Sequence, residues 1–229
     1  MLDIVCFYWK GTDRPTWHDQ ELGVQYINRL YAGVCRNLTL PFKFTCFLQE
    51  GLPKEGIDSG VTVRYFDSPS WKGCLPKLKA FDHSNGFQGR VIVLDLDLVI
   101  TGNLDEMFSY NGRFMTRSTF RKLPKTLSGG DIVFFGAGTM PFWEVLNAEP
   151  EKVEEITGGR ERFVYRKFFS KIGMDFVQLQ YPNQIFSYKR HVARSNNKLS
   201  PNCRIVSCHG RPRPHEINAP FVKDNWINV

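Results

Sequence analysis

The chain of 229 residues is 42% hydrophobic and 23% charged, and its formal net charge is +7. Its length fits one domain with a large core, and its composition is that of an ordinary globular protein. No apolar run is long enough to span a membrane. The N-terminal residues lack the basic region of a signal peptide, and the six cysteines are scattered, several of them in apolar runs. We therefore expect buried thiols rather than disulfides, in a cytoplasmic protein.

The positive charge lies in the second half of the chain. Residues 1–110 carry 11 Lys and Arg against 13 Asp and Glu, whereas residues 111–229 carry 19 against 10. A one-sided basic field favours an anionic partner such as nucleic acid, a phospholipid surface or a phosphorylated substrate. A solvated basic face without a partner explains the same asymmetry.

Hydrophobic patterns predict strands and helices along the whole chain. The expected strands are Leu2–Phe7, Phe42–Leu48, Val61–Phe66, one beginning at Arg90, Gly112–Arg117, Ile132–Phe135, Phe176–Gln178, Phe186–Lys189 and Arg204–Ser207. The expected helices are Gln20–Asn37, Lys77–Phe81, Leu104–Phe108, Pro141–Asn147, Pro150–Thr157 and Arg160–Lys171. Strands alternate with helices in the first half, which predicts an α/β fold with a mostly parallel central sheet and an α+β second half.

Two carboxylates interrupt the apolar stretch that begins at Arg90. Asp95 and Asp97 follow four apolar residues, and alternation along a regular strand would place both on one face. Buried carboxylates must be paired or must bind a metal, and hard oxygen ligands suit Mg²⁺ or Mn²⁺ held with a phosphate-bearing substrate. Two acids that cap a strand or form salt bridges are the alternative.

A histidine and two arginines follow the last predicted strand. His209 is a suitable ligand for Mn²⁺, Gly210 allows close approach of the backbone to a ligand, and Arg211 and Arg213 suit phosphate recognition. A structural His is the simpler interpretation. Zinc bound by four residues is a second alternative, although the spacing matches no standard zinc pattern; these residues are Cys203, Cys208, His209 and His215.

Weaker signals lie between these motifs. The cluster Ser128–Gly129–Gly130–Asp131 precedes the predicted strand Ile132–Phe135 and could bring the backbone close to a sugar or phosphate, although a turn explains its glycines equally well. Trp71 and Lys77 could face a nucleotide by stacking and by charge, or could be a core residue and a solvated helix residue.

Together these motifs resemble a known family. Leu94–Leu104, with Asp-x-Asp followed by apolar residues and Gly-x-Leu, resembles the DxD strand of GT-A nucleotide-sugar glycosyltransferases, particularly the glycogenin and lipopolysaccharide galactosyltransferase group. His209–Glu216 resembles the C-terminal motif of that group, and further matches lie at Tyr26–Tyr31, Lys77–Phe81 and Pro182–Lys189. The resemblance implies a single Rossmann-like GT-A domain over residues 1–229. Within the family, the chain is similar to a compact branch of such enzymes found in bacteria and their phages. Residues 1–110 would bind the donor and residues 111–229 the acceptor.

The resemblance also implies a role for individual residues. Asp97 and His209 would bind the metal, and Asp95 would bind the metal or the donor ribose. Arg213 and Lys77 would hold the diphosphate. The remaining donor contacts would be the base loop Cys6, Phe7, Tyr8, Trp9 and Lys10, the motif residue Leu96, the sugar pocket Ser128, Gly129 and Gly130, and the C-terminal residues Gly210 and Arg211.

One segment departs from the family pattern. Relatives often have Gly-Asp-Gln at the start of the helix after the acidic segment, where this chain has Gly159–Arg160–Glu161. The carboxylate near the reacting centre is therefore expected to be either Glu161 or Asp131.

The sequence thus predicts a metal-dependent hexosyl- or pentosyltransferase that uses a nucleoside diphosphate sugar, expected to be a UDP-sugar, and a hydroxyl acceptor. The basic second half favours an anionic acceptor, with hydroxymethylated pyrimidine in phage DNA as the first candidate and a lipopolysaccharide or other glycan as the second. Two hypotheses from other classes remain open: a nucleotidyltransferase, and a nucleic-acid-binding protein without catalytic activity.

Overall fold

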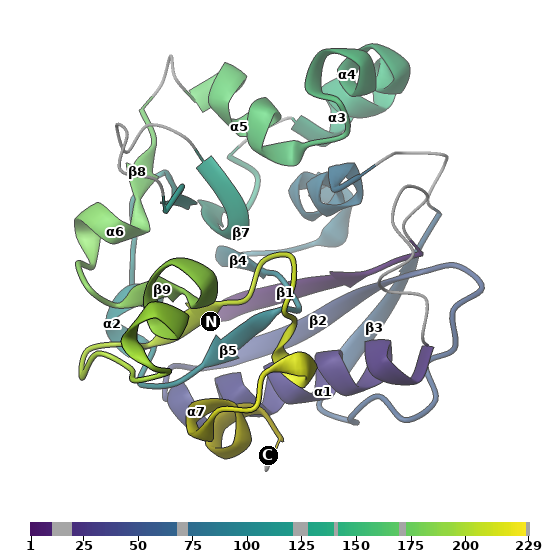
Figure 1. Ribbon diagram of the computed structural model, residues 1–229. Helices are drawn as coiled ribbons and strands as arrows, with labels where there is room; N and C mark the ends of the chain where they lie inside the picture. Colours follow the sequence, from purple (N-terminus) through teal and green to yellow (C-terminus); the bar gives the residue numbers. More distant parts are fainter. Residues whose placement is uncertain (11–19, 68–72, 121–127, 140–141, 170–172, 228–229) are drawn as a thin grey trace.

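The computed structural model has two β-sheets and a set of helices around them (Figure 1). It describes residues 1–10, 20–67, 73–120, 128–139, 142–169 and 173–227. The strands are β1 Leu2–Tyr8, β2 Phe42–Gln49, β3 Val61–Phe66, β4 Arg90–Leu94, β5 Leu98–Ile100, β6 Phe114–Ser118, β7 Ser128–Gly136, β8 Asp175–Phe176, β9 Ile185–Ser187 and β10 Ile205–Ser207.

Helices connect most of these strands. The α-helices are α1 Gln20–Asn37, α2 Asp105–Phe108, α3 Phe142–Ala148, α4 Pro150–Thr157, α5 Glu161–Phe169, α6 Val177–Gln180 and α7 Pro220–Val222. The 3₁₀ and π helices are η2 Leu75–Phe81, η3 His83–Asn85, η4 Tyr188–Val192, η5 Ala193–Ser195, η6 Pro214–Glu216 and η7 Lys223–Ile227. In the described ranges no helix combines the length and the apolar character needed to cross a membrane.

The larger sheet has seven strands in the order β3-β2-β1-β4-β7-β6-β8. Strands β3, β2, β1 and β4 are parallel, β7 is antiparallel to both β4 and β6, and β8 is parallel to β6. The predicted α/β fold with a mostly parallel sheet is confirmed, and the antiparallel strands belong to the second half of the chain, which was predicted to be less regular.

Both faces of the sheet are covered, and the alternation of side chains in β1 shows how. Ile4 and Cys6 belong to the core beneath α1, whereas Val5 and Phe7 belong to the core beneath η2, α3 and α5. Figure 1 shows α1 on one side of the sheet and α3 to α5 on the other. Central parallel strands are buried on both faces and are therefore apolar at consecutive positions, as Arg90–Leu94 is after its first residue.

The Asp-x-Asp segment is not part of a regular strand, and that prediction was wrong. Strand β4 ends at Leu94, Asp95–Asp97 forms a turn, and β5 begins at Leu98 in a second sheet of order β5-β10-β9. The residues on both sides of the two aspartates are apolar because β4 and β5 are both buried in the core. The two aspartates share an edge of the fold because they lie in one turn, and not because of strand alternation.

Other boundaries also differ from the predictions. Ser128–Gly130 does not precede a strand but forms the first residues of β7, which is extended by pairing with β6. Residues predicted as the strand Phe176–Gln178 divide between β8 and α6, and Lys189 lies in η4 rather than in β9. Trp71, Arg121, Lys122, Lys125 and Lys171 lie outside the described residues.

The C-terminal segment is anchored to α1 by an aromatic cluster. Trp226 is 1% exposed and packs edge-on against Tyr26, with ring centroids 4.8 Å apart. The guanidinium of Arg29 lies 4.2 Å from the centre of the Trp226 ring. Since Tyr26 also contacts the loop after β10, the C-terminal segment supports that loop through this cluster.

Replacing Trp226 should therefore destabilise the whole fold. We expect Trp226→Ala to lower the free energy of unfolding by about 3–5 kcal/mol, because it leaves a large cavity beneath α1. Urea denaturation followed by far-UV circular dichroism measures this change. The matched control is the neighbouring exposed residue, for which Ile227→Ala should stay within about 0.5 kcal/mol of the original chain. Equal effects of the two changes would contradict the anchoring role.

Candidate functional site

Charged side chains gather where β4, β7 and β10 meet. Asp95 follows β4, and its amide donates to the carbonyl of Asp131 in β7 over 2.9 Å. The amide of Cys208, just after β10, donates to the carbonyl of Asp97 over 3.1 Å. These backbone bonds hold the segments that carry the charges at the carboxyl end of β4, which is the edge where ligands bind in open α/β sheets.

A base pairs with each carboxylate of the Asp-x-Asp turn. Lys77 of η2 forms an ion pair with Asp95, and Arg213 forms one with Asp97. Arg213 belongs to the segment His209–Glu216 after β10, which we call the C-terminal loop. Burial, with the charges of Asp97 and Asp131 nearby, raises the pKa of Asp95 to about 6 despite the Lys77 ammonium. Burial also raises the pKa of Asp97, against the opposing effect of Arg213. Within the described structure, the Oδ1 atom of Asp97 is buried and accepts no hydrogen bond.

Lys77 connects the turn to α5. Its ammonium lies 3.2 Å from Oε1 of Glu161 and 3.4 Å from the carbonyl oxygen of Gly130, to which it donates a hydrogen bond. The side chains of Lys77 and Glu161 are each only 6% exposed. A buried lysine between two carboxylates stays charged, because their attraction outweighs the burial that would lower its pKa.

A second chain of contacts joins Asp131 to His209. Asp131 pairs with Arg117 of β6 and accepts a hydrogen bond of 2.6 Å from the Ser207 hydroxyl. The Ser207 oxygen lies 3.4 Å from Nδ1 of His209. Because the single hydroxyl proton points at Asp131, Ser207 can only accept from Nδ1–H, and the lone pair of His209 is then on Nε2. Burial and the nearby Arg117 lower the pKa of His209, which favours the neutral ring.

The two glycines of β7 make room for these charged side chains. A Cβ on Gly129 would overlap the guanidinium of Arg117, and a Cβ on Gly130 would overlap the carboxylate of Glu161. Gly130 also has a φ of +76°, which other residues rarely adopt. In this structure the glycines therefore contact protein side chains, and their predicted role in lining a sugar pocket stays a prediction.

The C-terminal loop is braced by its own side chains. The Glu216 carboxylate accepts from the Arg213 amide over 2.6 Å and from the exposed Arg211 guanidinium over 2.5 Å. His215, in the same loop, lies with Nδ1 2.6 Å from the Tyr26 hydroxyl of α1. These contacts hold Arg213 beside Asp97, whereas Arg211 points to Glu216 and the solvent.

The predicted base loop is in part core. Cys6, Phe7 and Tyr8 end β1 and are buried, with Cys6 and Phe7 in opposite cores. Trp9 is half-buried, and the amide of the exposed Lys10 donates to Gln49 over 2.8 Å. Leu96, in the Asp-x-Asp turn, is buried as well. Any contact of Cys6, Phe7 or Leu96 with a nucleotide would therefore have to come from the backbone.

The predicted metal ligands can be tested against this geometry. Among the described residues, no three His, Cys, Asp or Glu side chains are gathered as a metal-binding group. This holds for Asp95, Asp97 and His209, and also for the zinc alternative. The chemistry of the first set still fits Mn²⁺ or Mg²⁺, because Asp97 offers an unbonded buried oxygen and His209 a neutral ring. The metal site stays a prediction.

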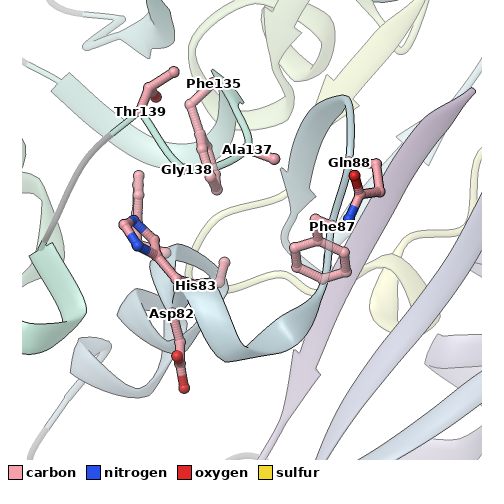
Figure 2. Close-up of a pocket in the computed structure, with 10 residues that line it drawn as sticks. Asp82, His83, Phe87, Gln88, Phe135, Ala137, Gly138 and Thr139 are labelled. Atoms are coloured by element: carbon pink, nitrogen blue, oxygen red, sulfur yellow. The ribbon is translucent and has the colours of Figure 1, made fainter.

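A cavity of about 320 Å³ lies away from the charged cluster, near the residues that precede β4 (Figure 2). His83 and Phe87 lie on two sides of it, and the turn at Ala137 closes a third, where the Ala137 amide donates to Gly89 over 2.8 Å. The cavity contains none of the predicted site residues. We place the candidate site at the charged cluster, because buried carboxylates and bases are concentrated there.

Comparisons with known proteins identify the fold of the chain. No family model matches the sequence, and neither does any curated protein. Among solved structures, the galactosyltransferase LgtC in complex with donor and acceptor sugar analogs matches with a TM-score of 0.64, covering 97% of this chain and 96% of LgtC at 10% identity. The chain has the fold of these glycosyltransferases.

A second match is the glycosyltransferase GlyE of Streptococcus pneumoniae TIGR4. Its TM-score is 0.64 at 12% identity over 99% of this chain, and its apo form gives 0.61 at 13% identity. The chain spans 59% of the length of GlyE. The expected resemblance to glycosyltransferases is thus confirmed for the fold, whereas the DxD chemistry and the phage branch are not tested.

Two residues of the cluster, Arg117 and Ser207, were not among the predicted site residues. Each is the last residue of a predicted strand. Neither belongs to a motif with a characteristic spacing. The pairing of β6 with β7 brings Arg117 to Asp131, and Ser207 reaches Asp131 from β10 of the second sheet; no local pattern predicts either contact.

The Arg117–Asp131 pair leads to a stability prediction. Burial alone would raise the pKa of Asp131, but Arg117 and the hydrogen bonds from Arg117 and Ser207 outweigh it and hold this pKa below its usual value. We expect Asp131→Asn to cost about 3–5 kcal/mol of unfolding free energy at pH 7, because Arg117 is left buried without a counter-charge. The difference should shrink below about pH 4, where the carboxyl takes up a proton in the unfolded chain while it is still ionised in the folded protein.

Urea denaturation at pH 7 and at pH 3 measures both effects. The control is Asp224→Asn, because Asp224 is exposed, and it should leave the free energy of unfolding unchanged within about 0.5 kcal/mol at either pH. A loss of stability for Asp131→Asn that is the same at both pH values would contradict the role of its charge.

Proposed function

We propose that this protein is a metal-dependent glycosyltransferase that moves a sugar from a nucleoside diphosphate sugar, with a UDP-sugar as the first candidate, to a hydroxyl acceptor. One observation carries the proposal: the fold of a galactosyltransferase extends over nearly the whole chain, and a buried cluster of carboxylates and bases lies at the ligand-binding edge of that fold. Structures with this likeness need not share their chemistry, so the proposal depends on the cluster.

The residues of the cluster suit the charges of such a reaction. The bond between the anomeric carbon and the diphosphate oxygen breaks, and the diphosphate leaves with the electron pair. The acceptor oxygen bonds to the carbon, and its proton passes to the departing diphosphate. A divalent cation held by Asp95, Asp97 and His209 would stabilise the leaving diphosphate as a Lewis acid. Arg213 and Lys77 carry positive charge to the same place.

Two residues are candidates for the carboxylate near the anomeric carbon. Asp131 is ionised and held between Arg117 and Ser207, and Glu161 is held by Lys77. Burial raises the pKa of Glu161 even though Lys77 opposes the shift. We assign the position nearer the sugar to Glu161, because Asp131 already uses both oxygens in bonds to Arg117 and Ser207.

The acceptor is proposed to be anionic. Exposed bases lie on α5 and on the segment after β9, and they are Arg166, Lys167, Arg190 and Arg194. They are compatible with hydroxymethylated pyrimidine in phage DNA, which an enzyme would have to expose, for example by base flipping. A glycan acceptor such as lipopolysaccharide is the second candidate, and it is favoured by the acceptor sugar analog bound in LgtC.

The donor can be identified by a thermal-shift screen of nucleotide sugars with and without Mn²⁺. The correct donor at about 100 times its Kd should stabilise the fold by about 2.7 kcal/mol, which corresponds to a rise in Tm of roughly 5–10 °C for a chain of this size. We expect Asp97→Ala to remove the Mn²⁺-dependent part of the shift and to abolish both sugar transfer and donor hydrolysis. Asp224→Ala, at an exposed site, should change neither.

The products separate the competing classes of protein. A glycosyltransferase releases a nucleoside diphosphate, and a nucleotidyltransferase releases pyrophosphate, so chromatography of the reaction mixture distinguishes them. A chain that no nucleotide sugar stabilises, or full activity of Asp97→Ala, would overturn the proposed function.

The DNA acceptor has a test of its own. Binding to duplex DNA should weaken steeply between about 50 and 200 mM salt, because basic side chains that contact phosphates release counterions. Fluorescence anisotropy with a labelled duplex measures this slope, and a change of Arg190 and Arg194 to Gln should make it shallower. Absence of binding at low salt would leave the glycan as the acceptor.

A further inference from the structure

Lys189 reaches the candidate site from η4, the short helix that follows β9. Strand β9 is parallel to β10, and Ser187 pairs with Ser207 in their register. Lys189 follows Ser187 by two residues, just as His209 follows Ser207. The parallel pairing therefore carries Lys189 to the start of the C-terminal loop.

Gly210 provides the space for the Lys189 ammonium. Its φ is +73°, and a Cβ at this position would lie 2.8 Å from Nζ of Lys189. Any side chain here would adopt an unfavourable backbone conformation and would also push the ammonium away. The position of this ammonium is thus linked to the glycine that precedes Arg211.

The charge of Lys189 has no counter-ion in the described protein. Lys77, Arg117 and Arg213 each form an ion pair with a carboxylate of the cluster, whereas Lys189 forms none among the described residues. Its side chain is half-buried, unlike that of the exposed Arg190 next to it. Burial and the charge of Asp97 raise the pKa of the Cys208 thiol, whereas the charges of Arg213 and Lys189 oppose this shift. Lys189 therefore lies within electrostatic range of the same thiol as Asp97 and Arg213.

We propose that Lys189 binds a phosphate group of the nucleoside diphosphate, together with Arg213. A half-buried ammonium without a carboxylate, beside a glycine and an arginine, is suited to an incoming anion. The donor is the better source of that anion than the acceptor, because Lys189 lies against the loop that carries Arg213, whereas Arg190 and Arg194 are exposed. This inference rests on the proposed function and adds a donor-binding residue to it.

Isothermal titration with uridine diphosphate and with inorganic pyrophosphate, each with Mn²⁺, tests the role. We expect Lys189→Gln to weaken both by about 10- to 100-fold, as for the loss of one charged hydrogen bond. The matched control is Lys198→Gln, which removes the same charge from an exposed side chain nine residues along the chain and should change affinity less than about twofold. Gly210→Ala, a second variant, should weaken both probes by displacing the ammonium, and thermal unfolding checks that each variant is folded.

The outcomes separate the two proposals. If the original chain binds uridine diphosphate and Lys189→Gln binds it equally well, the role of Lys189 is overturned and the proposed function stands. Equal losses for Lys189→Gln and Lys198→Gln would also overturn it, because a general effect of positive charge would explain both. Loss of duplex DNA binding with unchanged diphosphate binding would assign Lys189 to the acceptor instead. An original chain that binds neither probe would overturn both proposals.

Discussion

The burial of like charges at one edge of the sheet is the constraint on which this structure depends. Four carboxylates lie within one cluster and are matched by three permanent cations; they are Asp95, Asp97, Asp131 and Glu161, with Lys77, Arg117 and Arg213. Burial, together with repulsion from Asp97 and Asp131, raises the pKa of Asp95. Each base comes from a different part of the chain, so the cluster exists only when the whole domain is folded.

The proposed function would account for these buried charges, whose removal from water costs free energy. Replacing a buried ion pair by apolar residues is often neutral or stabilising, so ion pairs alone do not account for the cluster. The proposed binding of a divalent cation and a diphosphate would need carboxylates and bases together. The ion pairs of Asp95 with Lys77 and of Asp97 with Arg213 match these buried charges within the protein itself. Lys189 differs because its charge is not matched in this way.

The scaffold around the cluster is built for rigidity. Strands β1 and β4 are packed on both faces, and the aromatic cluster of Tyr26 and Trp226 holds the C-terminal loop from below. The Glu216 carboxylate fixes the same loop from within. Arg213 and His209 therefore belong to a loop that is held by several contacts. Such support is suited to residues that bind a ligand in a defined geometry.

The sequence alone determined the α/β class, the approximate position of most strands and helices, and the chemical character of the segments around Asp95 and His209. Apolar periodicity and charged residues at the ends of apolar runs are local signals, and they survive in a single sequence. The tertiary structure decided that the Asp-x-Asp segment is a turn between two sheets, that Gly129 and Gly130 lie beneath Arg117 and Glu161, and that Ser207 and Lys189 join the cluster. These contacts join residues far apart in the chain, because strand order and register are set by the packing of the whole domain and not by any local pattern.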